Sequence, residues 1–139
     1  MNAPGGPAAN EAMRSLLRGA FDAAIAVADP ARIVPAHLPE PPAGRVVVVG
    51  AGKAAAAMAL AVDRAWAQTP LDGLVVTRYG HGVATRRVSV HEASHPVPDA
   101  AGAFAARQIL AQVQRTTEDD LVLVLISGGA SALLALPVE

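Results

Sequence analysis

The sequence has no cysteine and few aromatic residues, and both absences narrow what the protein can be. Without cysteine there is no disulfide framework, no thiolate nucleophile and no cysteine-ligated metal, which favours a cytoplasmic setting. The aromatic residues are Phe21, Trp66, Tyr79 and Phe104, so a core must be built from aliphatic side chains. The 139 residues give room for one domain.

An excess of charge and long apolar runs are also missing. The chain carries 11 basic and 12 acidic side chains, which provide no field to attract nucleic acid or anionic lipid. No apolar run reaches the roughly 18 residues that a membrane span needs. The first nine residues also lack the basic and apolar parts of a signal peptide. We therefore expect no nucleic-acid partner and no membrane, and a small molecule or a protein as the partner.

The beginning of the chain divides into three segments. Residues 1–9, rich in Ala, Pro and Gly, predict a disordered lead. Asn10 is placed to cap a helix, and apolar residues such as Leu17 and Phe21 recur at helical spacing, which predicts one buried face. The segment 30–44 contains five prolines and predicts an extended connector.

The rest of the chain alternates strand and helix patterns, which predicts an α/β class with a mainly parallel sheet and right-handed crossovers. The strand at 87–91 suits a sheet edge, and the apolar run at 121–126 suits the centre. Turns are expected at 69–73 and at 118–120, the second of them solvated. The expected strands are 45–49, 74–77, 87–91 and 121–126, and the expected helices are 54–66, 100–114 (capped by Asp99, with Phe104, Ile109, Leu110 and Val113 on its buried side) and 132–136.

A glycine turn with a lysine, Gly50-Ala-Gly-Lys53, joins the first strand to its helix. We expect the first N–H groups of that helix to be unpaired and able to hold a phosphate or carboxylate. The positive charge of Lys53 is unfavourable beside the positive end of the helix dipole, so its presence there favours a bound anion nearby. The turn matches the dinucleotide fingerprint only loosely and is not a Walker A loop. The alternative is a close-packed turn with a solvated lysine.

A second glycine turn, Ser127-Gly-Gly-Ala-Ser131, ends another strand, so both turns should lie at the carboxyl edge of the sheet. Its successive N–H groups can form an anion-binding nest, to which two serine hydroxyls add donors. Two such turns and a lysine suit phosphoryl transfer, which needs mainly positioning and charge stabilisation. The alternative is a packing turn in which Ser131 caps a helix.

Other candidates lie in the loops at the same edge. Arg78 follows the second strand, where an arginine could accommodate the 2′-phosphate of NADP; a plain loop charge is the alternative. The segment from His91 to His95 spells the zinc-protease pattern, but Pro96 and the strand-like residues before it disfavour the helix which that site requires. Glu92 and His95 remain candidate site residues, with ordinary surface residues as the alternative.

Four blocks in this order and spacing resemble the amino-terminal part of the bacterial glycerate 2-kinases, some of which also carry the name hydroxypyruvate reductase. The resemblance runs from about residue 11 to the last residue. The blocks are VVGAGKAA (48–55), GLVVTRYGHG (73–82), EASHPVPD (92–99) and DLVLVLISGGASALL (120–134).

The resemblance implies ATP-dependent phosphorylation of the 2-hydroxyl of glycerate, with Mg²⁺. It also implies a Rossmann-like, three-layer αβα sandwich, with residues 10–139 as the amino-terminal part of the large domain and the second domain absent from this chain. Lys53 matches the family's catalytic lysine. The candidate phosphate-binding residues are Gly50, Ala51, Gly52, Ser127, Gly128, Gly129 and Ser131, and the candidate substrate-site residues are Arg78, Glu92 and His95.

The chain departs from this family in two ways. Ala130 and Ser94 stand where the family usually has glycine, which restricts both turns. Family members are also considerably longer. We therefore expect an amino-terminal portion that is inactive alone, leaves Leu133, Leu134 and Leu136 uncovered, and either self-associates or requires a missing half. An NADP-dependent hydroxypyruvate reductase and a non-catalytic nucleotide-binding domain remain open alternatives.

Overall fold

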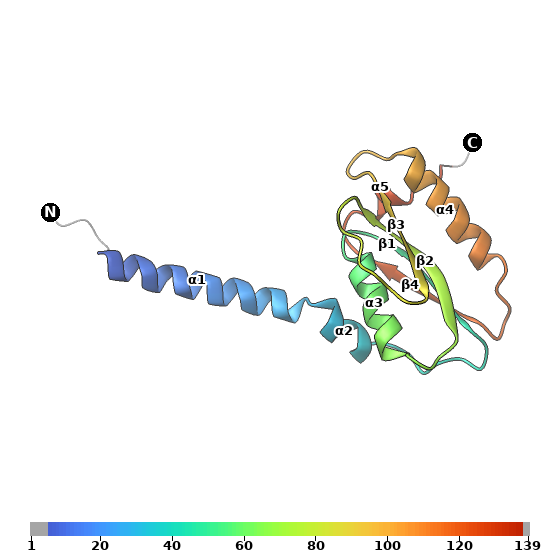
Figure 1. Cartoon of the computed structure of the whole chain (residues 1–139), viewed down its shortest axis with the longest axis horizontal. Coiled ribbons are helices and arrows are strands. Elements are labelled where there is room, and N and C mark those ends of the chain that lie inside the picture. Colours follow the sequence, from blue (N-terminus) through green and yellow to red (C-terminus); the bar gives the residue numbers. More distant parts are fainter. Residues whose placement is uncertain (1–5, 138–139) are drawn as a thin grey trace.

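Residues 6–137 are described here from a computed structural model of the chain, and they form one parallel sheet with helices (Figure 1). The strand order is β3-β2-β1-β4, which confirms the predicted α/β class. The strands are β1 (Val46–Ala51), β2 (Leu71–Arg78), β3 (Val88–Ala93) and β4 (Leu121–Ile126), and the helices are α1 (Pro7–Val27), α2 (Pro30–Ala36), α3 (Ala55–Ala65), α4 (Ala100–Val113) and α5 (Ala130–Leu133).

The valine-rich strand β1 is buried along its whole length between β2 and β4. Strand β2 begins earlier than predicted, at Leu71, so part of the expected turn at 69–73 is strand. Gly73 makes this possible, because its φ is 145° and a Cβ there would collide with the carbonyl oxygen of Val48. Strand β3 lies at an edge, as expected.

Strand β4 has the predicted bounds but lies at the other edge of the sheet, not at its centre. Its side chains Val124 and Ile126 are more than half exposed. Strands of a parallel sheet are normally covered on both faces, and this explains why the apolar run predicted a central position.

Helices cover both faces of the sheet, giving the predicted three-layer arrangement (Figure 1). On one face, Ala59 and Val62 of α3 pack in a cluster with Val48 and other strand residues. On the opposite face, Ala105 of α4 and Leu133 of α5 pack with residues of β1 and β2. Leu133 is fully buried, so the expectation that it would be uncovered is wrong; Leu134 is partly buried and Leu136 is exposed.

Helix α4 begins as predicted, because the Asp99 carboxylate accepts a hydrogen bond from the Gly102 N–H at 2.9 Å. The predicted apolar face is only partly buried. Phe104 and Leu110 are about half exposed, and the buried positions are small: Gly102, Ala105 and Ala106. The helix therefore approaches the sheet closely along a stripe of small residues, which leaves its larger side chains at the flanks.

Helix α1 extends away from the rest of the molecule (Figure 1). It begins at Pro7 with Gly6 as its N-cap, rather than at Asn10, and residues 1–5 of the expected lead lie outside the described part of the chain. The predicted buried face is not found, since Leu17 and Phe21 are 61% and 65% exposed. An amphipathic pattern predicts a helix, but only a packing partner buries its apolar side.

The segment after α1 is helical over 30–36, so the expected extended connector is wrong there. Pro30 occupies the first turn, where a missing N–H costs little, and the Asp29 carboxylate accepts a hydrogen bond from Ala31 N at 2.9 Å. Val34 is buried in the cluster that contains α3. Packing against α3 thus stabilises a short helix in spite of its prolines. Among the described residues, no helix is long and apolar enough to cross a bilayer.

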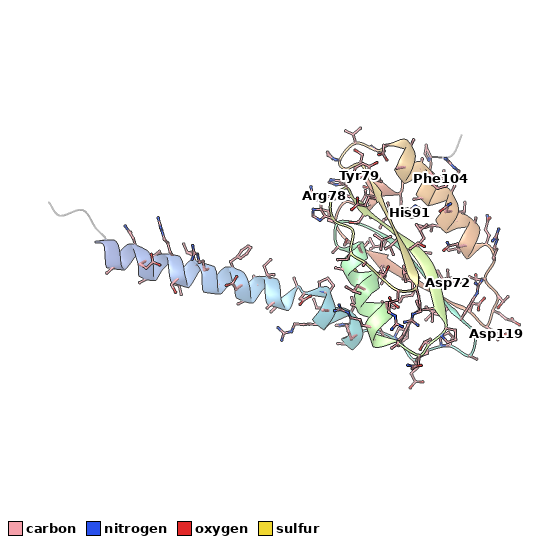
Figure 2. The ribbon with its side chains drawn as sticks, viewed as in Figure 1. Asp72, Arg78, Tyr79, His91, Phe104 and Asp119 are labelled. Atoms are coloured by element: carbon pink, nitrogen blue, oxygen red, sulfur yellow. The ribbon has the colours of Figure 1, made fainter. Side chains whose placement is uncertain are left out.

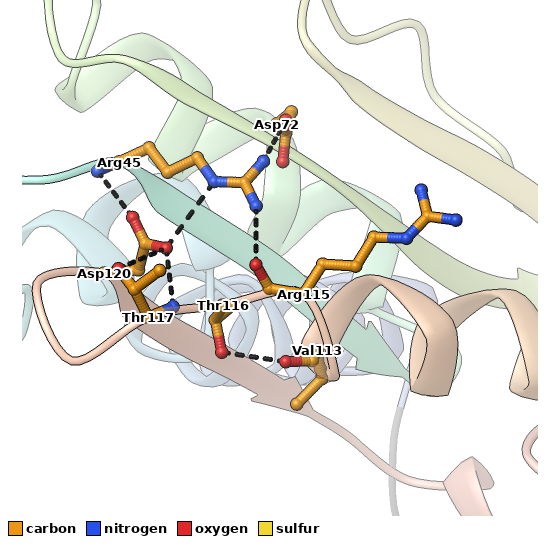
Figure 3. A network of polar contacts seen from close by, with 7 residues as sticks. All are labelled: Arg45, Asp72, Val113, Arg115, Thr116, Thr117 and Asp120. Atoms are coloured by element: carbon orange, nitrogen blue, oxygen red, sulfur yellow. Dashed lines mark hydrogen bonds and ion pairs between the residues drawn. The ribbon is translucent and has the colours of Figure 1, made fainter.

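A polar network joins the amino ends of β1, β2 and β4 (Figure 3). The Asp120 carboxylate accepts from Arg45 N at 3.1 Å and from Thr117 N at 2.9 Å, and its partners hold its pKa below the usual range, chiefly the Thr117 N–H. The Arg45 guanidinium lies 3.3 Å from Asp72. Asp120, expected in a merely solvated turn, therefore fixes the start of β4 beside β1.

A buried ion pair anchors the start of β3 to the end of α3. Asp63 is 3% exposed and accepts from Arg87 Nε at 2.7 Å and from Arg86 N at 2.6 Å. Burial by itself raises the pKa of Asp63, but the hydrogen bonds from Arg86 and Arg87 outweigh it and lower the pKa. Arg87 also donates to the carbonyl oxygens of Asp63, Trp66 and Thr69.

Candidate anion-binding site

The carboxyl ends of β1 and β4 mark the place where a ligand is expected to bind. The order in which the chain adds strands reverses there, because β2 and β3 lie on one side of β1 and β4 lies on the other. In open parallel α/β sheets, the crevice at such a switch point is the usual ligand site. The turn at 50–54 after β1 and the turn at 127–131 after β4 meet at this point, as their contacts show.

The first glycine turn is closed by hydrogen bonds within the protein. Four successive N–H groups donate to protein acceptors: Gly52 to Val76 O at 3.0 Å, Lys53 to Gly128 O at 2.9 Å, Ala54 to Ser127 Oγ at 2.9 Å and Ala55 to Gly52 O at 3.1 Å. These four N–H groups are therefore not free to bind an anion, whereas those of Ala56 and Ala57, in the first turn of α3, donate to no protein group among the described residues. Gly50 and Ala51 are buried within β1, so this turn offers a ligand mainly the exposed side chain of Lys53.

The second glycine turn is open. Within residues 6–137, the N–H groups of Gly128 and Gly129 donate no hydrogen bond to another protein group. A Cβ at Gly128 would meet no atom within 4 Å, and Gly129 has a left-handed φ of 92°. Successive free N–H groups around a left-handed glycine can form an anion-binding nest. Ser131 is exposed in the short helix α5, which begins directly after Gly129.

Two side chains from distant parts of the chain lie against Gly129. A Cβ at Gly129 would be 2.7 Å from Nε2 of His95 and 3.5 Å from Cε of Lys53. The structure therefore brings together Lys53, His95 and the 127–131 turn, all of which the sequence predicted as site residues. A cation, an imidazole and free N–H groups around one turn are suited to a phosphate or a carboxylate.

Glu92, by contrast, holds a neighbouring loop. Its Oε1 accepts a hydrogen bond from Gly82 N at 2.7 Å, and Tyr79 N donates to Ala93 O at 3.1 Å. These contacts fold the start of the 79–87 loop back along the end of β3. Glu92 thus has a structural partner that the sequence did not reveal.

Arg78 and Tyr79 lie at the end of β2 opposite to Asp72 (Figure 2). Arg78 is exposed and forms no ion pair within the described residues. The Tyr79 hydroxyl donates to Asp99 Oδ2 at 2.9 Å, and this bond is the main cause of the raised pKa of Tyr79. The pKa of Asp99 is lowered, mainly by the hydrogen bond from Gly102 N.

The residues of the zinc-protease pattern do not share a helical face. His91 and Glu92 are neighbours on β3, and His95 follows that strand in a loop. The His91 ring stacks on Phe104 of α4, with centroids 6.5 Å apart (Figure 2). Among residues 6–137, no three His, Asp or Glu side chains are grouped as metal ligands. These residues therefore do not fit a zinc site.

Two side-chain contacts to the backbone of the 53–54 segment were missed from the sequence. Ser127 was expected to contact phosphate, but its Oγ accepts from Ala54 N, and the hydroxyl of the buried Thr77 donates to Lys53 O at 3.4 Å. No local pattern signals either contact, because each joins residues that are far apart in the sequence. The fold and the site together define an α/β protein with a candidate anion site at the carboxyl ends of β1 and β4.

The chain belongs to the family described as "Domain of unknown function (DUF4147)", whose model matches residues 16–139. A protein of Agrobacterium vitis provisionally named as a hydroxypyruvate reductase is 59% identical over 89% of this chain and 28% of its own length. The D-glycerate 2-kinase of Thermotoga maritima is 40% identical over 79% of this chain and 27% of its own length.

Solved structures agree with this assignment. The crystal structure of a glycerate kinase from Thermotoga maritima matches with a TM-score of 0.81 and 37% identity, over 93% of this chain and 31% of that one. A protein from Pyrococcus horikoshii matches with a TM-score of 0.74 and 36% identity, over 90% and 31%. The chain thus spans about a third or less of the relatives that it matches.

Proposed function

We propose that this chain is the part of a glycerate 2-kinase that binds the phosphates of ATP and supplies the catalytic lysine. The observation that carries the proposal is the convergence of Lys53 and His95 on Gly129, beside free N–H groups at the switch point. Relatives named as glycerate kinases support glycerate as the substrate. The proposed setting is cytoplasmic, and the remainder of the active site is contributed by sequence outside these residues.

The open turn fits a phosphate group. The N–H groups of Gly128 and Gly129 have no protein acceptor, and the space beside Gly128 is empty. A Cβ at Gly129 would displace His95. Glycine at both positions therefore keeps a small cradle that a phosphate can enter, with the Ser131 hydroxyl nearby in the sequence as a further donor.

In the proposed reaction, the 2-hydroxyl oxygen of glycerate attacks the γ-phosphorus of ATP. An O–P bond forms, the bond from that phosphorus to the bridging oxygen breaks, and ADP leaves with the bond's electron pair. The hydroxyl proton leaves to a base or to solvent, and the product is 2-phosphoglycerate. Lys53 neutralises charge on the transferred group, His95 borders the phosphate cradle at Gly129, and Arg78 is the proposed partner of the glycerate carboxylate.

ATP needs Mg²⁺ in this proposal, but the described residues do not provide a cage for it. No three metal-ligating side chains are grouped there, and Glu92 is already bonded to Gly82 N. Mg²⁺ is commonly held by phosphate oxygens and water with only one or two carboxylates. We assign no step and no ligand in this chain to the metal.

The test is a kinase assay on the complete polypeptide that contains residues 1–139. We expect ADP release that depends on glycerate, and a Lys53→Ala variant that loses about 10²- to 10³-fold in kcat while remaining folded. Arg64→Ala is the matched control, because Arg64 is an exposed cation in the last turn of α3, the helix that follows Lys53. Normal turnover by Lys53→Ala would remove Lys53 from the mechanism.

The same preparation tests the reductase alternative, which the name of the Agrobacterium vitis relative favours. In that alternative the 2′-phosphate of NADPH binds Arg78, which is exposed and without an ion pair among the described residues. Loss of NADPH absorbance with hydroxypyruvate, reduced in Arg78→Gln, would establish it. Nucleotide binding with no turnover in either assay would instead indicate a binding domain.

A further inference from the structure

The backbone on both sides of the Lys53 Cα is held by hydrogen bonds to residues just after β4 and to Thr77 near the end of β2. Lys53 N donates to Gly128 O at 2.9 Å, and the next N–H, of Ala54, donates to Ser127 Oγ at 2.9 Å. From the other side, Thr77 Oγ1 donates to Lys53 O at 3.4 Å. The turn that carries Lys53 is therefore bonded to the end of β4 and to the end of β2.

These contacts leave the turn little freedom. Gly52 has a φ of 132°, and a Cβ there would collide with Ser127, so the backbone of the turn lies directly against that residue. Thr77 is fully buried, and its hydroxyl donates to Lys53 O. A buried hydroxyl without a partner is destabilising, so this contact has a structural reason as well.

The Lys53 side chain itself is long and exposed. The position of its ammonium group therefore depends on how firmly its backbone is held. A misplacement of about 1 Å in a catalytic group can cost about 10²-fold in rate. Bonds that fix the Lys53 peptide units therefore affect transfer without touching the substrate.

We propose that Ser127 and Thr77 are positioning residues that hold Lys53 at the transferred phosphoryl group; this rests on the proposed kinase function. Ser127 acts by accepting the Ala54 N–H, and Thr77 acts by donating to Lys53 O. Direct phosphate binding, the role that the sequence predicted for Ser127, is the competing explanation. The competing explanation does not apply to Thr77, because its fully buried side chain cannot touch a substrate, and for Ser127 the KM for ATP separates the two.

The experiment uses the complete polypeptide and measures kcat and the KM for ATP and glycerate. Ser127→Ala removes the acceptor, and Thr77→Val removes the donor while keeping a similar shape. We expect about a 10- to 100-fold lower kcat for Ser127→Ala and a several-fold lower kcat for Thr77→Val, with both KM values changed by less than about twofold. Ser127→Thr and Thr77→Ser keep a hydroxyl and should restore most of the rate.

A double-mutant cycle with Lys53→Ala gives the decisive readout. If Ser127 and Thr77 act through Lys53, neither substitution lowers the residual rate of Lys53→Ala any further. The same fold-loss in both backgrounds, or a raised KM for ATP in Ser127→Ala alone, would overturn the proposal. So would a lower melting temperature with unchanged kcat. If Ser127→Ala does not fold, the Thr77→Val cycle decides alone.

The outcome is separable from that of the proposed function. If the unsubstituted polypeptide does not phosphorylate glycerate, the kinase proposal fails, and the positioning of Lys53 in a kinase fails with it. If it phosphorylates glycerate and Lys53→Ala is inactive, but the two cycles are additive, only the positioning proposal fails.

Discussion

The Asp63–Arg87 pair should contribute more to stability than any other ion pair among residues 6–137. Asp63 is 3% exposed, and its carboxylate accepts from Arg87 Nε at 2.7 Å and from Arg86 N at 2.6 Å. Asp63→Ala removes both hydrogen bonds and leaves the Arg87 guanidinium without its counter-charge. Removing one partner of a buried pair typically costs about 3–5 kcal/mol.

The expected loss for Asp63→Ala is smaller than that range. The Arg87 side chain is 26% exposed, so water screens part of the uncompensated charge. Its guanidinium also keeps its hydrogen bonds to the carbonyl oxygens of Trp66 and Thr69. We therefore expect a decrease of about 2–3 kcal/mol in the free energy of unfolding. Arg87→Lys should lose a large part of this, because a lysine keeps the charge but not the planar fork.

Urea unfolding at pH 7, followed by the fluorescence of Trp66, measures the change. Trp66 is the single tryptophan, is 9% exposed, and its carbonyl oxygen accepts from Arg87. Asp22→Ala is the matched control, because Asp22 is exposed on α1. If Asp63→Ala destabilises the protein no more than Asp22→Ala does, the reasoning about the buried pair is refuted.

The pH dependence provides a second check on the same pair. The folded-state pKa of Asp63 lies below its ordinary value of 3.8, so the unfolded chain binds more protons in the window between the two values. The stabilisation is therefore present above about pH 4 and is lost as the pH falls through the folded-state pKa. Asp63→Asn should lose less stability than the unsubstituted chain over this window.

Two further substitutions test other parts of the structure. Gly129→Ala should lower the free energy of unfolding by about 1–2 kcal/mol, because φ is 92° there. It should also lower phosphate affinity, because the new Cβ would displace His95. Gly128→Ala is the control for strain, because a Cβ at Gly128 would meet nothing within 4 Å. Phe21→Ser should change the unfolding free energy of this chain by less than about 0.5 kcal/mol, because Phe21 is 65% exposed. A large loss for Phe21→Ser in urea unfolding would mean that α1 packs on something in solution.

Strand β4 and the start of helix α4 were the most predictable parts of this protein. The run 121–126 became β4 with the predicted bounds, because six consecutive apolar residues between turn residues have few other stable conformations. The helix after Asp99 was predictable because its N-cap is local in sequence. The helix over 30–36 was not, since packing of Val34 overrides the preference of its prolines.

The two glycine turns had the same appearance in the sequence, and the structure distinguishes them. The N–H groups of the turn at 50–54 are satisfied by Val76, Gly128 and Ser127, whereas those of Gly128 and Gly129 have no acceptor among the described residues. The anion site is accordingly proposed at the second turn, with Lys53 reaching it from the first.

The sequence by itself determined the class of the fold and the candidate residues, because apolar periodicity, glycine turns and helix caps are local properties of the chain. Tertiary structure alone decided which candidates meet. Ser127 bonds to Ala54 because β4 lies beside β1, whereas His95 reaches Gly129 through the loop after β3, although β3 and β4 lie at opposite edges of the sheet. Such contacts depend on the order of strands in the sheet, which no local pattern specifies.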